Sequence, residues 1–358
     1  MKLILGIESS CDETAVSIVG DGHKVLSNIV ASQIAKHAVY GGVVPELAAR
    51  EHLNAIKPVT DQALAEANVS IKDIDAIAVT NVPGLMPALL VGLNFARGLS
   101  LSNNIPLIGI NHFVAHIYSA FLNDNIKILS DINSFPILAL VVSGGHTALV
   151  LIDKDSCSKI IGTTIDDAAG EAMDKGAKLL DLGYPGGPVI DKLSKDGDPN
   201  KFRFPRSLTG TSGKAVSKEN TYNFSFSGLK TSLLYHIEKN SGKENFKGDL
   251  LYDTIASYQN AIVDVLCMKT IKAAKKFNAR SIVLCGGVAQ NSLLRQELDR
   301  RTHKNTKFIL TPREYCGDNA AMIAGLGFHY LNSEKFDLAI DASSRLPKFS
   351  EVPFVPVL

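Results

Sequence analysis

The chain has 358 residues, of which 46% are hydrophobic, so it can bury a large core and is expected to form two domains. Its 37 lysines and arginines nearly balance its 36 acidic residues, which argues against a positively charged coat for nucleic acid. The five cysteines show no C-x-x-C spacing, so neither a disulfide framework nor a zinc knuckle is indicated, and a reducing, cytoplasmic setting is expected.

No membrane segment is expected either. The apolar stretch at the N-terminus is too short for a signal peptide and is followed at once by Glu8 and Asp12. The longest run without charge, 76–96, is interrupted by prolines, glycine and asparagines. A buried strand, a turn and a helix account for it better than a bilayer span.

The first half of the chain opens on a polar hairpin, "LILGIESSCDETAVSIV" (Leu3–Val19). Two apolar runs flank a turn of hydroxyl and acidic residues, where an ordinary hairpin would have Asn-Gly or Asp-Gly. The pattern then predicts a helix from Pro45, a strand at 74–80, a helix from about Pro87 to 101, and a short strand at 106–110.

The second half repeats this plan. A second polar hairpin, "PILALVVSGGHTALVLI" (Pro136–Ile152), precedes predicted helices near 168–180, 187–193 and 254–277. A late strand at 281–285 leads through two glycines into another helix, and the polar segment 207–223 is expected to be a mobile surface loop. The repetition predicts an α/β fold of two similar lobes with largely parallel sheets and a ligand in the cleft between them.

Two histidines suggest a metal site. His112 and His116 in "NHFVAHIYSA" are four residues apart in a helix-like segment, so both imidazoles project from one face. Such a pair chelates a divalent cation when a third ligand is added, for which Asp318 is a candidate, although a helix N-cap is the simpler role for it. A metalloprotease is disfavoured, because the position after His112 is Phe113 and the glutamate base of H-E-x-x-H is missing.

Other polar segments suggest a phosphate-bearing ligand. The turn Ser143–Thr147 contains two glycines, whose backbone N–H groups are open to a phosphate, although an ordinary tight turn is equally expected. Asp167, Glu171 and Asp174 are expected on one helix face, either as partners for ribose hydroxyls or as a solvated surface. Neither a G-x-G-x-x-G fingerprint after a strand nor a Walker A sequence is present, so a Rossmann dehydrogenase and a P-loop NTPase are disfavoured.

These segments together resemble one family. The paired hairpins are similar to the actin/Hsp70/sugar-kinase (ASKHA) fold, and the chain closely resembles the TsaD family of tRNA N6-adenosine threonylcarbamoyltransferases, once described as O-sialoglycoprotein endopeptidases. The segment YPGGP is similar to the bacterial and organellar branch of this family. The matching motifs are "GIESSCDETAVSIV", "HAVYGGVVPELAAREH", "PGLMPALLVG", "NHFVAH", "LVVSGGHT", "DDAAGEAMDKGAKLLDLGYPGGP", "FSFSGLKT", "CGGVAQNSLLR" and "GDNAAMIA".

The resemblance implies roles for particular residues. His112, His116 and Asp318 would hold iron or zinc, and Asp12 and Glu13 would face the reacting centre. The adenylate would be bound by Val141, Val142, Ser143, Gly144, Gly145, Asp174, Gly187, Asp191 and Asn291. One departure is that Val114 and Ala115 stand where bacterial members often carry a glutamate and a glycine.

The resemblance also implies an organisation and an activity. The N-terminal lobe would comprise residues 1–110 with a C-terminal segment, about 320–358, packing back on it; the second lobe would comprise 111–319 with an insertion at about 160–250. The enzyme would move the threonylcarbamoyl group from threonylcarbamoyl-AMP to N6 of adenosine 37 in tRNAs that read ANN codons. Its partners would be tRNA, a TsaB-like subunit of homologous fold and a TsaE-like small ATPase, and its cleft would hold an adenine nucleotide (threonylcarbamoyl-AMP, ATP or AMP).

Two other classes remain open from the sequence. A small-molecule kinase of the same fold would use ATP directly and would need magnesium ligands in place of a histidine pair. A nucleotide-switched scaffold without catalysis is the third possibility.

Overall fold

The computed structural model describes residues 1–155, 157–211, 213, 215–331, 339–345 and 352–354. Contacts divide the chain into two compact units. The first contains residues 1–133, 154–158 and those from 311 on, and the second contains residues 134–153 and 159–310.

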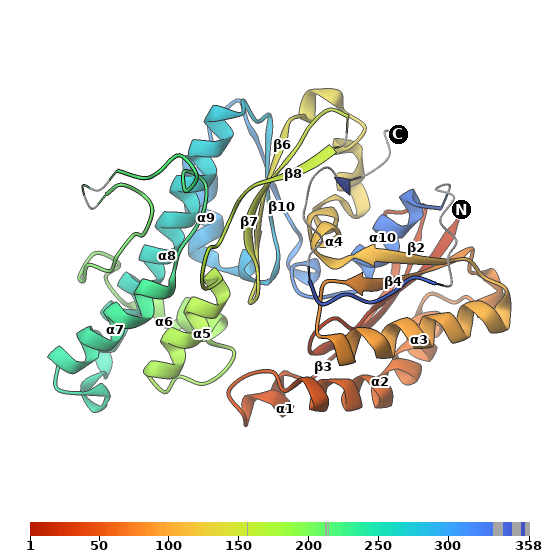
Figure 1. The fold of residues 1–358 in the computed structure, drawn as a ribbon, viewed down its shortest axis with the longest axis horizontal. Helices are drawn as coiled ribbons and strands as arrows, with labels where there is room; N and C mark the ends of the chain where they lie inside the picture. Colours follow the sequence, from red (N-terminus) through yellow and green to blue (C-terminus); the bar gives the residue numbers. More distant parts are fainter. Residues whose placement is uncertain (156, 212, 214, 332–338, 346–351, 355–358) are drawn as a thin grey trace. The chain divides into compact units, whose positions relative to one another are not determined.

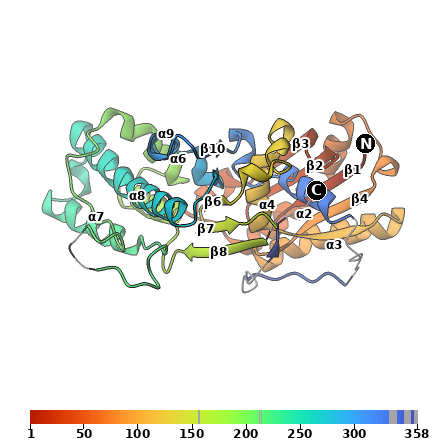
Figure 2. The same cartoon turned by 90° about the horizontal axis from the view of Figure 1, so that it is seen from above.

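The first unit is built on a five-stranded sheet in the order β3-β2-β1-β4-β5 (Figures 1 and 2). β1, β2 and β3 pair antiparallel, whereas β1, β4 and β5 are parallel. Its strands are β1 (Leu3–Glu8), β2 (Glu13–Gly20), β3 (Lys24–Ser32), β4 (Ala76–Val82) and β5 (Leu107–Asn111). Its helices are α1 (Ile34–Ala38), α2 (Pro45–Glu66), α3 (Met86–Asn103), α4 (His112–Tyr118) and α10 (Ala321–His329).

The alternation of side chains along β1 builds a core on both faces of this sheet. Leu5 and Ile7 belong to a buried cluster with Ile56 of α2 and Leu93 of α3. The opposite face of the sheet packs against α10, which contacts β1, β2 and β4. Every residue of β1 is buried, so this strand is the centre of the unit.

Gly6 allows the closest approach of a helix to this sheet. A Cβ atom there would lie 2.7 Å from the backbone nitrogen of Ala324 and 2.9 Å from its Cβ, and it would also collide with the carbonyl oxygen of Ala320. Both alanines belong to the segment that forms the start of α10, so only glycine lets this helix lie directly on β1.

The second unit repeats the first. Its sheet runs β10-β9-β6-β7-β8, which is the same order with β8, β7, β6, β9 and β10 in place of β3, β2, β1, β4 and β5, and the short β11 (Val352–Pro353) adds at β8. Its strands are β6 (Ile137–Val142), β7 (Thr147–Ile152), β8 (Cys157–Thr163), β9 (Ser281–Cys285) and β10 (Lys307–Leu310). Its helices are α5 (Ala169–Leu179), α6 (Gly186–Leu193), α7 (Ser227–Lys239), α8 (Gly248–Lys276) and α9 (Ser292–Arg301). The predicted duplicated α/β architecture is confirmed.

Three details differ from the sequence prediction. Both sheets are mixed, because β1, β2 and β3 pair antiparallel in the first sheet and β6 and β7 pair antiparallel in the second. The third strands, β3 and β8, were not predicted. The division near residue 133 differs from the predicted boundary at 110, because α4 packs against α10 and β5 of the first unit.

The C-terminal segment predicted to pack back on the first unit is described only in part. α10 does lie on the first sheet, and the side chain of Phe354 is buried. Residues 332–338, 346–351 and 355–358 are outside the described residues.

Candidate functional site

Two imidazoles and a carboxylate meet within the first unit. α4 begins at His112, and the Asn111 side chain caps it by accepting hydrogen bonds from the backbone N–H groups of the next turn. The four-residue spacing places His112 and His116 on one face, and Asp318 lies in the segment just before α10. One ligand atom from each of the three residues lies within 4.8 Å of the others.

The geometry and chemistry of this cluster suit a divalent cation. Asp318 Oδ1 lies 3.1 Å from His116 Nε2 and 3.5 Å from His112 Nε2. His116 is buried, and neither of its ring nitrogens forms a hydrogen bond among the described residues, although Nε2 lies within ion-pair distance of Asp318. A buried imidazole without a hydrogen bond is costly unless a ligand satisfies it, and a His₂Asp set is one that zinc and iron accept.

Glu8 supports the cluster from behind and was not singled out from the sequence. It is fully buried at the end of β1, and its Oε2 lies 2.9 Å from His112 Nδ1. The same carboxylate accepts hydrogen bonds from the Thr80 hydroxyl and the Ser10 backbone N–H, both at 2.5 Å. Because Glu8 accepts from Nδ1–H, the lone pair of His112 Nε2 is left facing Asp318.

The charged forms of Glu8 and His112 stabilise one another. Burial would raise the pKa of Glu8, but the charge of His112 and the hydrogen bond from it keep that pKa below its ordinary value. Burial would lower the pKa of His112, but the carboxylates of Glu8 and Asp318 raise it to about 9. The cluster therefore attracts positive charge, whether a proton or a metal ion carries it.

The turn between β1 and β2 carries the two predicted catalytic acids. Asp12 is buried, and Glu13 lies close enough to feel the charge of Asp318. Burial, followed by the charges of Asp318 and Asp12, raises the pKa of Glu13 to about 10. Burial and Asp12 likewise raise the pKa of the neighbouring Cys11 thiol, so this cysteine is no ready nucleophile.

In the second unit, the predicted phosphate turn lies at the carboxyl end of β6. Val141 and Val142 are the last residues of that strand, and the turn is closed by a hydrogen bond from the Ser143 N–H to the His146 carbonyl at 2.8 Å. Gly144 and Gly145 are exposed, and no atom outside their neighbours lies within 4 Å of where a Cβ would be. Their backbone is therefore accessible to a ligand.

The strand end beside this turn has its own glycine. Gly286 follows β9 with φ +91°, and a Cβ there would lie 2.8 Å from the carbonyl carbon of Val142. The short 3-10 helix Gly287–Gln290 that follows packs against β6 and α5. The end of β9 and the Ser143 turn are thereby brought together, as expected for residues at the carboxyl ends of parallel strands.

The remaining predicted nucleotide residues join three helices. Asp174 of α5 accepts a hydrogen bond from the backbone N–H of Gly186 at 2.7 Å, which fixes the start of α6 beside Gly187. Asp191 at the other end of α6 accepts from the Ser292 N–H and hydroxyl at 3.0 and 2.8 Å. Asp174 and Asp191 therefore accept hydrogen bonds from neighbouring segments, in addition to any that a ligand would donate.

The side chain of Asn291 uses its acceptor but not its donor in the described part of the chain. Its Oδ1 caps α9 by accepting from the Leu294 N–H at 2.9 Å, while its buried Nδ2 has no hydrogen-bond partner among the described residues. Oε1 of the buried Gln259, whose Nε2 lies 3.5 Å from Asp191, is also unsatisfied there. Such groups commonly await a bound ligand or water.

The predicted acidic helix face is partly neutralised. Lys175 forms ion pairs with Asp167 at 2.7 Å and with Glu171 at 2.9 Å. Among the described hydrogen bonds, Asp174 is the one of the three predicted carboxylates that reaches the α6 segment, whereas Asp167 precedes α5 and accepts from Lys175.

The polar segment predicted as a loop is anchored at both ends. Arg206 pairs with Asp264 of α8 at 2.6 Å. At the other end, the buried Lys269 donates to the carbonyls of Asn220 and Thr221 at 2.9 and 3.1 Å. Its tip includes residues 212 and 214, which are outside the described residues, so its mobility stays a prediction.

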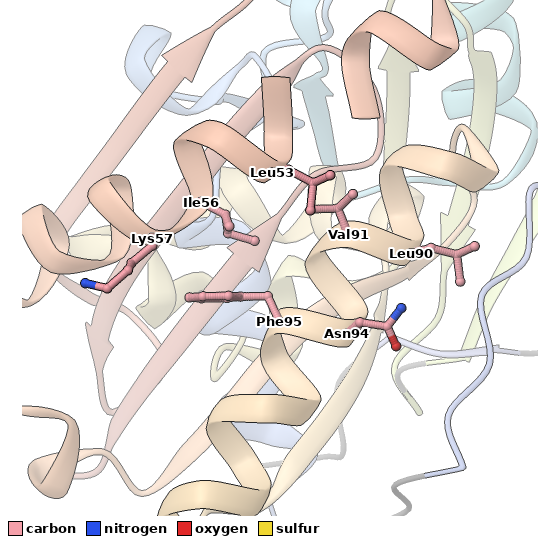
Figure 3. Close-up of a pocket in the computed structure, with 7 residues that line it drawn as sticks. All are labelled: Leu53, Ile56, Lys57, Leu90, Val91, Asn94 and Phe95. Carbon is pink, nitrogen blue, oxygen red and sulfur yellow. The ribbon is translucent and has the colours of Figure 1, made fainter. Parts of the chain in front are cut away.

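A cavity of about 410 Å³ lies elsewhere on the first unit, between α2 and α3. Figure 3 shows side chains of the two helices facing one another across it. It is lined by Leu53, Ile56, Lys57, Leu90, Val91, Asn94 and Phe95, none of which was predicted as a site residue. In the described part of the chain, no helix combines the length and apolar character needed to cross a bilayer.

Comparison with known proteins gives a consistent result. The model of a family described as TsaD, tRNA N6-adenosine threonylcarbamoyltransferase, matches residues 24–325. A curated protein of that description from Syntrophus aciditrophicus is 49% identical over 347 residues, covering 96% of this chain and 97% of its own. One from Thermosipho africanus is 50% identical over 347 residues, covering 96% and 99%.

Solved structures share the fold at low identity. HypF from T. kodakarensis is similar with a TM-score of 0.60 and 15% identity, over 92% of this chain and 48% of HypF. Component A of the (R)-2-hydroxyglutaryl-CoA dehydratase of Acidaminococcus fermentans has a TM-score of 0.53 and 14% identity, over 92% and 99%. These likenesses establish the ASKHA-like fold and nothing about activity.

Proposed function

Because the chain belongs to the tRNA N6-adenosine threonylcarbamoyltransferase family, we propose that it transfers a threonylcarbamoyl group from threonylcarbamoyl-AMP to N6 of adenosine 37 in tRNAs that read ANN codons. The observation that carries this proposal is near-complete coverage at 49% identity by a relative of that description. The clustered His112, His116 and Asp318 add support from the geometry. No observation favours the small-molecule kinase over it.

The second unit would bind the adenylate. The open backbone of Ser143–Gly145 would receive the phosphate. Nδ2 of Asn291, which has no hydrogen-bond partner in the described part of the chain, would donate to a polar edge of the nucleotide. Asp174, Gly187 and Asp191 would surround the adenosine, whose ribose hydroxyls suit a carboxylate acceptor. Val141 and Val142 would support the turn from the end of β6.

His112, His116 and Asp318 would hold one iron or zinc ion. When bound, that ion would supply Lewis-acid polarisation to a carbonyl oxygen or anchor the threonyl carboxylate. Glu8 would keep His112 in the tautomer that presents Nε2 to it.

Asp12 and Glu13 would handle the proton. In the reaction, the exocyclic amine attacks the carbamoyl carbon, the new C–N bond forms, the bond to the phosphate oxygen breaks, and AMP leaves. The amine must lose a proton, and Asp12 or Glu13 would accept it.

The substrate and helpers follow from the same family assignment. We propose that tRNA is bound with the help of a TsaB-like subunit and a TsaE-like ATPase, since the charge of this chain is nearly balanced. The proposed work on tRNA and the five free cysteines fit a cytoplasmic location.

Reconstitution tests the function directly. The chain is combined with threonine, bicarbonate, ATP, an adenylate synthase, the two helper proteins and unmodified tRNA, and the nucleosides of the tRNA are analysed. The expected product is threonylcarbamoyladenosine. Its absence with folded, metal-loaded protein would overturn the proposal.

A variant tests the metal site in the same assay. His112→Ala should lose bound metal and nearly all modification, with its circular dichroism unchanged, whereas the exposed His303→Ala should retain both. Full activity in metal-stripped His112→Ala would exclude a role for the ion.

A further inference from the structure

Two buried histidines of the first unit have no part in the metal cluster. His37 and His52 are each fully buried, although the histidine ring has polar nitrogens at two positions. Buried polar groups almost always form hydrogen bonds, so the partners of these two rings show which segments they hold in place.

His52 of α2 forms two hydrogen bonds to the turn that carries Asp12 and Glu13. Its Nε2 lies 3.0 Å from the Cys11 carbonyl oxygen, and its Nδ1 lies 2.7 Å from the Thr14 hydroxyl. A carbonyl can only accept, so Nε2 carries the proton and Nδ1 accepts from the hydroxyl of Thr14. One neutral ring thus binds the residues on either side of the two acids.

Gln33 adds a third point and extends the network. Its backbone N–H donates to the Asp12 carbonyl at 2.9 Å, and its Nε2 lies 3.4 Å from both His52 Nδ1 and the Ala48 carbonyl. Its Oε1 accepts from His37 Nε2 at 3.1 Å, and His37 Nδ1 accepts from the Val44 N–H at 3.3 Å. Because Thr14 uses the one lone pair of His52 Nδ1, Gln33 Nε2 has the Ala48 carbonyl as its acceptor.

The turn needs such restraint because one of its acids lies in unfavourable surroundings. Burial and the nearby carboxylates of Asp318 and Asp12 disfavour the charged form of Glu13, so moving the turn toward solvent would relieve that cost. Bonds at Cys11, Asp12 and Thr14 resist that movement without adding another charge.

We propose that His52 is a positioning residue for the transfer reaction, and that with Gln33 and His37 it fixes the turn that presents Asp12 and Glu13. This inference rests on the proposed function only for the kinetic consequence. The restraint of the turn itself is independent of which reaction is catalysed.

Three variants of His52 separate the two bonds. His52→Gln keeps a donor near Nε2 for the Cys11 carbonyl, His52→Asn keeps an acceptor near Nδ1 for Thr14, and His52→Leu keeps neither. Thr14→Val removes the hydroxyl from the other side. The control is His236→Leu, which removes a partly buried histidine of the second unit that packs among Phe202, Phe204 and Phe246.

Hydrogen exchange of the peptide that spans 9–14 is the first readout and needs no activity. We expect faster exchange there in His52→Leu, a smaller increase in His52→Gln, His52→Asn and Thr14→Val, and no change in the control. Metal content and exchange in α4 and α10 should match the unsubstituted protein. Unchanged exchange at 9–14 in His52→Leu, or an equal increase throughout the first unit, would overturn the proposal.

Kinetics in the reconstituted assay are the second readout. His52→Leu should lower kcat by about 10–100-fold with the KM for threonylcarbamoyl-AMP unchanged, and His52→Gln should recover much of it. A loss confined to KM, or equal losses in both variants, would contradict positioning. If the unsubstituted protein made no product, the exchange result would still decide whether His52 restrains the turn.

Discussion

Glu8 holds His112 of the proposed metal cluster in place. A carboxylate can accept all three of its hydrogen bonds, from His112, Thr80 and Ser10, whereas an amide of the same shape presents N–H groups to one side. If the amide faced His112, Nδ1 would become the acceptor and the proton would move to Nε2, where it blocks a cation.

We therefore expect Glu8→Gln to weaken metal binding by about 10–100-fold. The measurement is competition against a chelator of known affinity, with metal content determined by mass spectrometry. Glu13→Gln is the matched control, because Glu13 makes no contact with His112 among the described hydrogen bonds and its raised pKa makes an amide a fair substitute. Equal affinity in the Glu8→Gln and unsubstituted proteins would show that His112 does not need this partner.

At this scale the sequence predicted the clustered side chains better than the residues that support them. The spacing of His112 and His116 predicts that both rings lie on one face of a helix, because helix geometry is local. Glu8 gave no such signal, since it ends an apolar strand and gains its role only from Thr80 and His112, both remote in sequence. The sequence likewise did not show that Nδ2 of Asn291 would lack a hydrogen-bond partner among the described residues, although Asn291 was singled out for its place after two glycines.

Among the elements, α7 depends on a carboxylate from outside it. Asp166 accepts hydrogen bonds from the hydroxyls of Ser225 and Ser227 at 2.6 and 2.8 Å and from the backbone N–H groups of Phe226 and Ser227 at 2.8 and 3.2 Å. These groups form the start of α7, whose first N–H donors would otherwise lack partners.

Asp166→Ala should cost about 1–2 kcal/mol of unfolding free energy and speed hydrogen exchange in the first turn of α7. Urea unfolding and exchange mass spectrometry measure the two effects. Asp249→Ala, which removes an exposed acid in the first turn of α8, should change stability by less than about 0.5 kcal/mol. Comparable losses in both variants would mean that Asp166 acts as a general surface charge.

Elements with a strong local pattern were predicted closely. Both polar hairpins and the start of α2 at Pro45 match the structure, because alternation, apolar runs and a first-turn proline are local features. β3 and β8 were missed because they lie in exposed surroundings and their residues are partly polar, so pairing with β2 and β7 creates them.

At the scale of the whole molecule, the division into two units predicts that each ligand stabilises chiefly the unit that binds it. The proposed metal ligands lie entirely in the first unit, whereas the predicted nucleotide residues all lie in the second. Zinc at 100 times its dissociation constant should therefore add about 2.7 kcal/mol of stability to the first unit. Hydrogen exchange should slow in β1, α4 and α10.

AMP is the complementary ligand in this experiment and should slow exchange around Ser143–Gly145 and Asn291. Zinc added to His112→Ala serves as the control and should protect nothing. Slower exchange on zinc addition that is confined to peptides of the second unit would contradict the assignment of the metal site.

The contact at Gly6 links the packing of the first sheet to the geometry of the histidine and aspartate cluster. The alanines it touches belong to the segment that follows Asp318, whereas the histidines of the cluster belong to another helix. A single methyl group at position 6 would push that segment outward and carry the carboxylate away from the imidazoles. Packing at this solvent-free position is thus coupled to the geometry of a cluster some distance away, and Gly6→Ala would impair the enzyme without touching any group that reacts.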